Sequence, residues 1–304
     1  MEKAHIIEDA AELREMLRGD SPPLLVDVRL EEEFAACHLP GACNNCTFEV
    51  VFLDRMERVA ADLHRPVCVY GAGAGSLESR MAAEKLCRMG YQVVLEFPGG
   101  MEAWKAAGFP VEENAAAAPS PPVITDGRMD LDLQESRVRW IGRNLLNRHE
   151  GYVAIKSGWI EIRDGALVAG EFVIDMEKIT CLDLAGDALH DVLIRHLLDH
   201  DFFDSALYPE ATFRIANVTP VGESTPGSPN LRIQGEMELK GVILPLAFDA
   251  CAGITPEGKP AAQATLAFDR TLWNVLYGSG KWFRHPGGHL VNDLIELQLR
   301  VVGG

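Results

Sequence analysis

The feature that most limits the folds open to this chain is an alanine- and proline-rich segment just past one third of its length. Residues 112–122 read Glu-Glu-Asn-Ala-Ala-Ala-Ala-Pro-Ser-Pro-Pro. This segment lacks the large apolar side chains of a core, and its prolines favour extended polyproline geometry. The whole chain of 304 residues also exceeds the usual size of one domain. We therefore expect two domains, at residues 1–113 and 123–304, joined by a linker at 114–122.

Before the linker, short apolar strands alternate with helices. Residues 24–28 and 67–70 are rich in β-branched side chains, as is typical of strands buried on both faces. Helical patterns follow at 50–62 and 79–89, and Gly90 ends the second as a left-handed cap. This alternation predicts an α/β domain with a parallel sheet covered on both sides.

After the linker, the hydrophobic period changes to two. Residues 231–240 and 295–301 alternate apolar with polar side chains, which indicates strands with one buried face. Further strands are predicted at 151–156, 159–163, 171–175, 212–216, 244–250 and 262–269. About eight antiparallel strands of this kind form a sandwich or a barrel, and a barrel removes the exposed edges. We expect a barrel, with a turn at Asp164-Gly165 and one helix at 187–198.

Charge and cysteine content limit the partners and the compartment. Asp and Glu outnumber Lys and Arg by 45 to 28, for a formal net charge of -17. Such a chain repels the phosphate backbone, so we expect no nucleic-acid partner. It has no apolar run of membrane-spanning length and no apolar N-terminal signal, so we expect it not to be membrane-embedded. Seven cysteines without a framework favour reduced thiols in the cytoplasm.

A series of short motifs occurs before the linker in a distinctive order. The motifs are Val26-Asp27-Val28-Arg29, Glu33-Phe34, His38-Leu39-Pro40-Gly41-Ala42, Pro66-Val67-Cys68-Val69-Tyr70, Gly99-Gly100 and Gly108-Phe109-Pro110. In this order they resemble the rhodanese-like family over about residues 5–112. The resemblance implies a sulfurtransferase fold with a catalytic cysteine directly after the central strand.

That cysteine is missing. The position after Tyr70 is Gly71, and the loop that would cradle a persulfide contains no thiol. The degenerate loop comprises Gly71, Ala72, Gly73, Ala74, Gly75, Ser76 and Ser79, with Leu77 and Glu78 between the two serines. No persulfide can form on glycine, so we expect a pseudoenzyme.

Three further interpretations of this loop stay open. Cys68 lies in the strand before the loop and is expected to be a buried small hydrophobe. The glycine-rich backbone could cradle phosphate or sulfate through its N–H groups. Ser76 and Ser79 could act as nucleophiles, although the nearby sequence supplies no base for them.

A second thiol group lies earlier in the same domain. Cys37, Cys43 and Cys46, with His38, form a soft ligand set that could bind a metal. Because His38 and its neighbours match the rhodanese-like pattern, we expect these thiols to be structural. Reversible dithiol chemistry at Cys43 and Cys46 remains an alternative.

Motifs after the linker form another distinctive set. They are Arg195-His196-Leu197, Phe202-Phe203, Tyr208-Pro209, Gly235-Glu236-Met237-Glu238-Leu239, Asp269-Arg270-Thr271, Tyr277-Gly278-Ser279-Gly280 and Asn292-Asp293. Together they resemble the YceI-like family of lipocalin-like barrels over about residues 125–302. The resemblance implies an eight-stranded barrel that holds an isoprenoid or quinone chain. Many family members are exported, whereas this chain has cytosol-like thiols, so its ligand could differ.

Apolar side chains on the inward faces are the candidate lining. They are Trp140, Phe172, Phe202, Phe203, Phe213, Met237, Phe248, Phe268 and Leu297, with the two adjacent phenylalanines at one mouth. Gly235, Ala250, Ala262 and Ala264 share faces with bulkier residues and should leave room inside. Each aromatic residue alone would equally suit a packed core.

Four histidines, His149, His190, His196 and His200, are a weaker candidate for a catalytic or metal site. His196 and His200 are four residues apart and would share one helical face. No further ligand stands at convincing spacing, so we expect no metal there.

Three functions are consistent with these observations. The first is binding of an apolar ligand in the barrel, with an inactive rhodanese-like module that docks a protein partner or regulates. In this case no cofactor is required beyond a bound isoprenoid or quinone lipid. The alternative is a thiol- or sulfur-handling enzyme, or a metal or redox protein, that uses Cys43 and Cys46. A third is a scaffold without a small-molecule ligand.

Overall fold

The computed structural model describes residues 4–114, 124–144, 146–284 and 290–304. Contacts divide the chain into two compact units, one up to residue 121 and one from residue 122. The predicted linker at 114–122 lies outside the described residues except for Asn114. No helix in the described ranges is both long and apolar enough to span a membrane.

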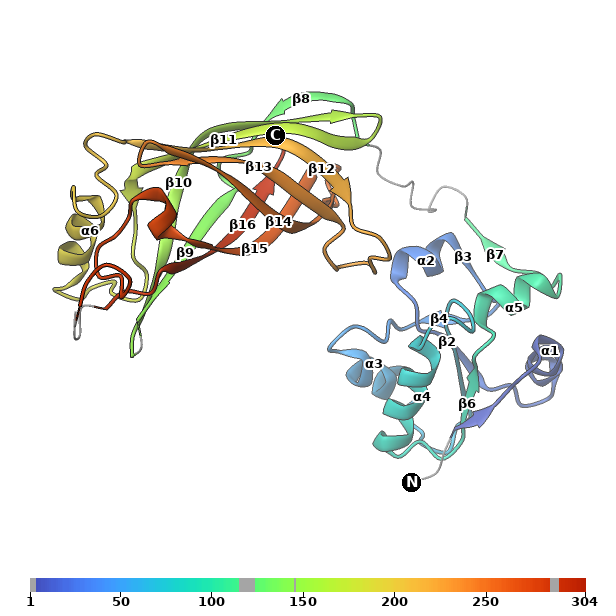
Figure 1. Ribbon diagram of the computed structural model, residues 1–304. Coiled ribbons are helices and arrows are strands. Elements are labelled where there is room, and N and C mark those ends of the chain that lie inside the picture. Colours follow the sequence, from blue (N-terminus) through green and yellow to red (C-terminus); the bar gives the residue numbers. More distant parts are fainter. Residues whose placement is uncertain (1–3, 115–123, 145, 285–289) are drawn as a thin grey trace. The chain divides into compact units, whose positions relative to one another are not determined.

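The first unit is built on a five-stranded parallel sheet (Figure 1). In spatial order its strands are β1 (His5–Ile6), β6 (Val94–Phe97), β5 (Val67–Tyr70), β2 (Leu24–Asp27) and β4 (Cys43–Asn44). A two-stranded antiparallel ribbon joins β3 (Cys37–His38) to β7 (Glu112–Glu113). The helices are α1 (Ala10–Arg18), α2 (Glu31–Ala36), α3 (Phe52–Val59), α4 (Glu78–Met89) and α5 (Gly100–Ala106). The α/β fold predicted from the alternation is confirmed.

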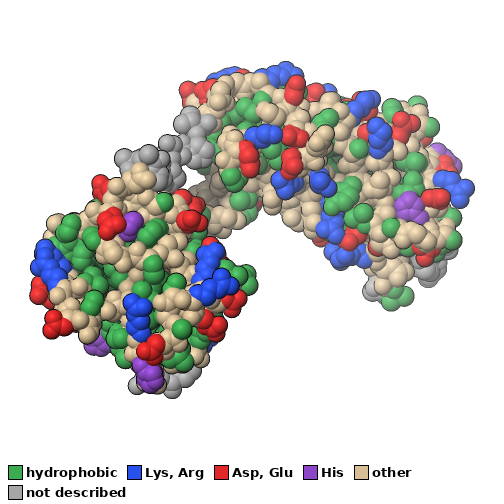
Figure 2. Space-filling view, turned by 180° about the vertical axis from the view of Figure 1, so that it is seen from behind, with side chains coloured by type: hydrophobic (Ala, Val, Ile, Leu, Met, Phe, Trp, Pro, Cys, Tyr) green, Lys and Arg blue, Asp and Glu red, His purple; other side chains and the backbone are tan. Residues whose placement is uncertain are grey.

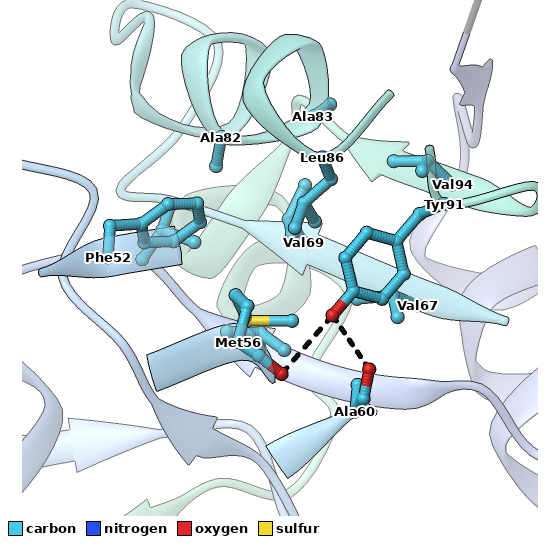
Figure 3. Packing of buried hydrophobic residues seen from close by; sticks show 12 residues of the cluster. Phe52, Met56, Ala60, Val67, Val69, Ala82, Ala83, Leu86, Tyr91 and Val94 are labelled. Carbon is cyan, nitrogen blue, oxygen red and sulfur yellow. Dashed lines mark hydrogen bonds between the residues drawn. The ribbon is translucent and has the colours of Figure 1, made fainter. Parts of the chain in front are cut away.

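Alternate residues of the central strand β5 belong to two separate hydrophobic cores, one on each face of the sheet. Val67 and Val69 pack against α3 and α4 on one face, and Cys68 and Tyr70 pack against α1 and α5 on the other. Figure 3 shows the first core, where the Tyr91 hydroxyl donates to the carbonyls of Met56 (3.2 Å) and Ala60 (2.7 Å). Two-sided burial explains the unbroken apolar runs in the sequence.

The predicted helices differ from the observed ones mainly at their ends. The helix expected at 50–62 is the shorter α3, because Val50 is fully exposed and the helix ends where Ala60 turns into the core. The helix expected at 79–89 begins one residue earlier, at Glu78. Gly90 ends it at φ 103°, so the left-handed cap is confirmed.

The second unit is a closed antiparallel barrel of eight strands (Figure 1). The strands are β9 (Arg137–Arg143), β10 (Arg148–Arg163), β11 (Ala166–Ile179), β12 (Glu210–Pro220), β13 (Leu231–Leu239), β14 (Val242–Ile254), β15 (Pro260–Asp269) and β16 (Leu294–Val302). Strand β16 pairs with β9, and β10 pairs with β11, which closes the ring. Strand β8 (Gly127–Asp130) adds to β10 outside the ring. Helix α6 (His190–Leu198) and a 3-10 turn (Arg270–Trp273) complete the unit.

Two strand assignments from the sequence were wrong. The strands expected at 151–156 and 159–163 form the single long strand β10, which continues through a register shift between Ile155 and Ser157. A bulge of this kind adds a residue without ending the strand. Strand β9 was missed, although Arg137-Val138-Arg139-Trp140 alternates with the two-residue period of a strand. The expected turn is confirmed, since Asp164 and Gly165 both have positive φ between β10 and β11. The predicted helix at 187–198 is α6, which starts at His190.

The outer surface of the barrel carries the charged side chains. Arg214 Nε lies 2.6 Å from Glu171, and Arg232 lies 3.0 Å from Asp249, in both cases across neighbouring strands. Figure 2 shows acidic and basic side chains interspersed over one face of the molecule. Exposed pairs of this type contribute about 0.2–1 kcal/mol each at most. The charged side chains therefore lie on the outer face of the strands, and the apolar side chains face the interior.

Candidate functional site

The degenerate loop follows β5, the central strand of the parallel sheet, where the rhodanese-like pattern places its nucleophile. The Ala72 N–H donates a 2.9 Å hydrogen bond to the carboxylate of Glu78, the first residue of α4. A Cβ at Gly71 would collide with that same carboxylate, and a Cβ at Gly73 would collide with the carboxylate of Glu102. Two acidic side chains therefore crowd the loop that would otherwise surround a thiolate.

Backbone contacts fix the loop against α5. The N–H groups of Met101 and Glu102 donate to the carbonyls of Gly71 (3.1 Å) and Ala72 (3.0 Å), and the Ser76 N–H donates to the Gly73 carbonyl at 3.0 Å. Gly100 has a φ of 53° and lies so close that a Cβ there would collide with the Gly71 carbonyl. These contacts hold the loop in a conformation in which the carboxylates of Glu78 and Glu102 both lie against it.

The two serines of the loop differ in environment. Ser79 is buried, and its hydroxyl donates to Glu96 of β6 at 3.1 Å. This carboxylate partner could not be predicted from the sequence, because Glu96 is 17 residues away and reaches Ser79 only through the order of strands in the sheet. Burial of both groups keeps the Ser79 hydroxyl away from a substrate. Ser76 is half-buried, and Ala74 and Gly75 are exposed.

The thiols of this unit do not form a common site. The Cys43 thiol donates to the Leu25 carbonyl at 3.6 Å, and burial raises its pKa. The Cys37 thiol lies 3.9 Å from Glu113, and Cys46 is buried. Burial raises the pKa of Cys68 to about 12, which removes its thiolate at neutral pH. Among the described residues, no metal-ligand group contains Cys37, Cys43 or Cys46.

The barrel encloses two apolar chambers. The hairpin-end chamber, of about 430 Å³, extends to Gly165 and Pro220, and the helix-end chamber, of about 350 Å³, extends to α6 and Tyr277. Five residues line both chambers, and together they form a waist between them: Val138, Ile174, Ala211, Met237 and Leu297. A single water needs only about 10–15 Å³ measured in this way, so neither chamber is an ordinary packing defect.

All nine apolar residues proposed from the sequence line one or both chambers. Phe172, Phe213 and Phe248 line the hairpin-end chamber, and Met237 and Leu297 belong to the waist. The helix-end chamber is lined by Trp140, Phe202, Phe203 and Phe268. The lining proposed from the sequence omitted the rest of the waist, and it also omitted His149, His196 and Tyr277, which line the helix-end chamber. The two-residue period would have revealed Val138 and Ala211 if β9 and the full length of β12 had been assigned.

Two expectations about the interior need correction. Gly235 leaves no empty space, because the ring of Phe213 and the Arg214 carbonyl occupy the position that its Cβ would take. Ala250, Ala262 and Ala264 do line the hairpin-end chamber. Phe202 does not sit open at a mouth, since it is 4% exposed and packs against Phe203 and His196.

A buried arginine organises the segment that follows β15. Arg270 is fully buried and donates to four backbone carbonyls, those of Val275, Tyr277, Val291 and Asn292. Lys281 bridges Asp269 (2.5 Å) and Asp293 (3.2 Å) beside it. These residues make up most of the last motif noted in the sequence. They hold Tyr277 and Val291 in the wall of the helix-end chamber.

The histidines of α6 and its C-terminal end do not form a metal pair. The His196 ring packs edge-on against Tyr277 with 4.3 Å between ring centroids. His200 lies beyond the helix end, 2.7 Å from Asp199, and this contact raises the pKa of its imidazole. The one His/Cys/Asp group with metal-ligand spacing in the described ranges consists of His149, Cys181 and Asp183.

The fold and the chambers define a class of protein: a hollow antiparallel barrel joined to a parallel α/β unit with glycine directly after its central strand. Residues 129–303 match the YceI-like domain family, and residues 9–107 match the rhodanese-like domain family. Because the first match covers more than half of the chain, the chain belongs to the YceI-like family, and it carries a rhodanese-like domain as well.

Several known proteins are similar to parts of the chain. A curated relative, the HTH-type transcriptional regulator Rv0324 of Mycobacterium tuberculosis, is 36% identical over 110 residues, or 36% of this chain. This chain spans 46% of that relative's length.

Solved structures resemble each unit. BcnA of Burkholderia cenocepacia is 19% identical, with a TM-score of 0.47, and the match covers 57% of this chain and 99% of BcnA. A polyisoprenoid binding domain from Saccharophagus degradans is 11% identical, with a TM-score of 0.41 and coverage of 59% and 98%. The Alr3790 protein of Anabaena is 31% identical, with a TM-score of 0.31 and coverage of 35% and 91%.

Proposed function

We propose that the barrel binds one elongated apolar molecule, such as an isoprenoid chain or a quinone tail. The observation that carries this proposal is the pair of apolar chambers that share one waist. An elongated chain that crosses the waist could occupy both chambers, whereas a compact ligand would occupy one. Membership of the YceI-like family supports the same ligand class.

Hydrophobic burial alone is sufficient for tight binding. Each isoprene unit moved from water into such a chamber contributes about 2–3 kcal/mol, at roughly 25 cal/mol per Å² of apolar surface. Apolar cavities of this size are typical of small-molecule sites. No catalytic group is needed for this function.

The rhodanese-like unit then serves for docking a protein partner or for regulation. Three features support an inactive unit: Gly71 replaces the nucleophile, Glu78 and Glu102 crowd the loop, and Cys68 is buried. The net charge of -17 disfavours a nucleic-acid partner. The seven cysteines are scattered through the sequence without a disulfide framework, and this favours a reducing compartment such as the cytoplasm.

The deciding experiment is native mass spectrometry of gently purified protein, followed by organic extraction and titration of the stripped protein with geranylgeraniol. Trp140 lines the helix-end chamber, so its fluorescence should change on binding. A stoichiometric isoprenoid, or saturable binding of the probe, is expected. Stripped, folded protein that binds neither geranylgeraniol nor a quinone would contradict the proposal.

A further inference from the structure

Three potential metal ligands from two chain segments meet at the rim of the helix-end chamber. His149 belongs to β10, whereas Cys181 and Asp183 follow β11. One donor atom from each residue lies within 4.8 Å of the other two. The His149 Nδ1 lies 2.8 Å from one oxygen of Asp183, and the Cys181 thiol lies 3.2 Å from the other.

The backbone holds these two segments together before any ligand binds. Thr180 N–H donates to the Tyr152 carbonyl at 2.8 Å, and Leu182 N–H donates to the Glu150 carbonyl at 2.8 Å. Gly151 lies between them, and a Cβ there would collide with the Thr180 carbonyl. The glycine therefore permits a close approach that brings Cys181 and Asp183 to His149.

The arrangement does not suit nucleophilic catalysis. A catalytic cysteine needs its thiol next to a base such as imidazole. Here the thiol and the imidazole both contact the Asp183 carboxylate, and burial raises the pKa of the Cys181 thiol. The three donors converge on a common point, as metal ligands do.

We propose that His149, Cys181 and Asp183 bind a divalent zinc-class cation at the rim of the helix-end chamber. Zn²⁺ takes imidazole nitrogen, thiolate sulfur and carboxylate oxygen together, at roughly 2.0–2.3 Å. Donors in such a tetrahedral site are about 3.3–3.8 Å apart, so small side-chain movements suffice.

Several contacts hold the Asp183 carboxylate in place. Its oxygens contact the His149 imidazole and the Cys181 thiol, and one of them accepts a hydrogen bond from the Glu150 N–H. The Glu150 N–H lies 2.8 Å from Asp183 and would orient the carboxylate from behind. Cation binding displaces the thiol proton of Cys181 to solvent, which leaves a thiolate on the metal.

The site would leave one tetrahedral position without a protein ligand. Water or an oxygen of a bound molecule can fill that position, and His149 also lines the helix-end chamber. Cation binding itself does not depend on the proposed lipid function, since it is measured with the metal alone.

The test uses the full chain, kept reduced, stripped with a chelator and titrated with Zn²⁺ and Co²⁺. The expected result is one equivalent of Zn²⁺, and a thiolate-to-cobalt charge-transfer band with Co²⁺. Cys181→Ser, His149→Gln and Asp183→Asn should each weaken binding by at least about 100-fold. Cys251→Ser, in the same barrel, is the matched control and should bind like the parent.

Circular dichroism tests whether each variant is folded, and the thermal unfolding midpoint, Tm, is a second measurement of cation binding. Saturating Zn²⁺ should raise the Tm of the parent and of Cys251→Ser, and leave the Tm of Cys181→Ser unchanged. Absence of stoichiometric Zn²⁺ binding by the folded parent would overturn the proposal. So would binding that survives Cys181→Ser and His149→Gln but is lost in a Cys43→Ser/Cys46→Ser variant.

Discussion

The Glu78 carboxylate accepts a 2.9 Å hydrogen bond from the N–H of Ala72, inside the loop where a rhodanese-like enzyme would carry its persulfide. The Ala72 N–H is thus already hydrogen-bonded to a side chain of the protein itself. The same carboxylate occupies the space into which a residue 71 side chain would project. The loop therefore has glycine at the position of the nucleophile and an acidic side chain, Glu78, beside that position.

Restoring the cysteine alone should therefore not restore sulfur transfer. In Gly71→Cys the new thiol lies against Glu78, and like charge disfavours the thiolate. We expect Gly71→Cys/Glu78→Gln to form at least about tenfold more persulfide from thiosulfate than Gly71→Cys, as measured by cyanolysis. Gly71→Cys/Glu84→Gln, which changes an exposed glutamate of α4, should behave like Gly71→Cys. Equal persulfide yields in all three variants would show that Glu78 has no such effect.

Narrowing the hairpin-end chamber should weaken ligand binding. Ala264 of β15 lines that chamber, whereas its neighbour Thr265 is exposed on the outer face. Ala264→Phe should reduce the affinity for geranylgeraniol by about tenfold or more, because the ring takes the space of an isoprene unit. Thr265→Phe is the matched control, with unchanged affinity expected by Trp fluorescence titration. A similar loss in both variants would point to a general effect on the strand.

Arg270 should be essential to the stability of the barrel. Arg270→Met leaves the carbonyls of Val275, Tyr277, Val291 and Asn292 without their buried donor. We expect urea unfolding to show a loss of about 3 kcal/mol or more in the free energy of unfolding. Arg232→Met removes an exposed cross-strand pair and should cost less than about 1 kcal/mol. Comparable losses in the two variants would refute this role for Arg270.

Gly151 should not tolerate a side chain, although it lies within a strand. Gly151→Ala places a Cβ against the Thr180 carbonyl, so the segment to Asp183 must move away from β10. A loss of about 2 kcal/mol or more in stability is expected from such overpacking. Gly253→Ala is the control, because that strand glycine has open space around it and no positive φ. Its stability should be equal to the parent or slightly higher. A Gly151→Ala variant as stable as Gly253→Ala would disprove the tight contact.

The decrease in the free energy of unfolding at acid pH should depend on the ionisation of Asp269. Partial burial opposes its ionisation, but Lys281 and Thr271 hydrogen-bond the carboxylate and lower its pKa in the folded chain. A depressed pKa gives stability that is complete above the ordinary carboxyl pKa and is lost as the pH falls below it. Asp269→Asn should therefore lose less stability than the parent between about pH 5 and about pH 2.5. If the free energy of unfolding of the parent and of Asp269→Asn depended on pH in the same way, this contribution would be excluded. Asp249→Asn, on the outer surface, is the control and should behave like the parent.

Much of the architecture could be predicted because it depends on local periodicity and on motifs. The change from mixed strands and helices to a two-residue period separated an α/β domain from a barrel. Errors arose where local signals conflict with pairing. Strand β10 continues through the bulge after Ile155, which resembles a turn in the sequence. Strand β9 was left unassigned although its first half alternates polar with apolar residues.

The sequence by itself determined which residue follows the central strand and which residues face inward. Gly71 in place of cysteine is a fact of the sequence, and alternation along strands placed the nine apolar residues on inward faces. Only the tertiary structure decided how these residues share space. It filled the space beside Gly235 with Phe213, separated the interior into two chambers, and brought Glu102 to the loop of Gly73. It also brought Cys181 to His149 across two strands. Periodicity fixes the direction of a side chain, whereas contacts between distant segments depend on register, bulges and close backbone approach.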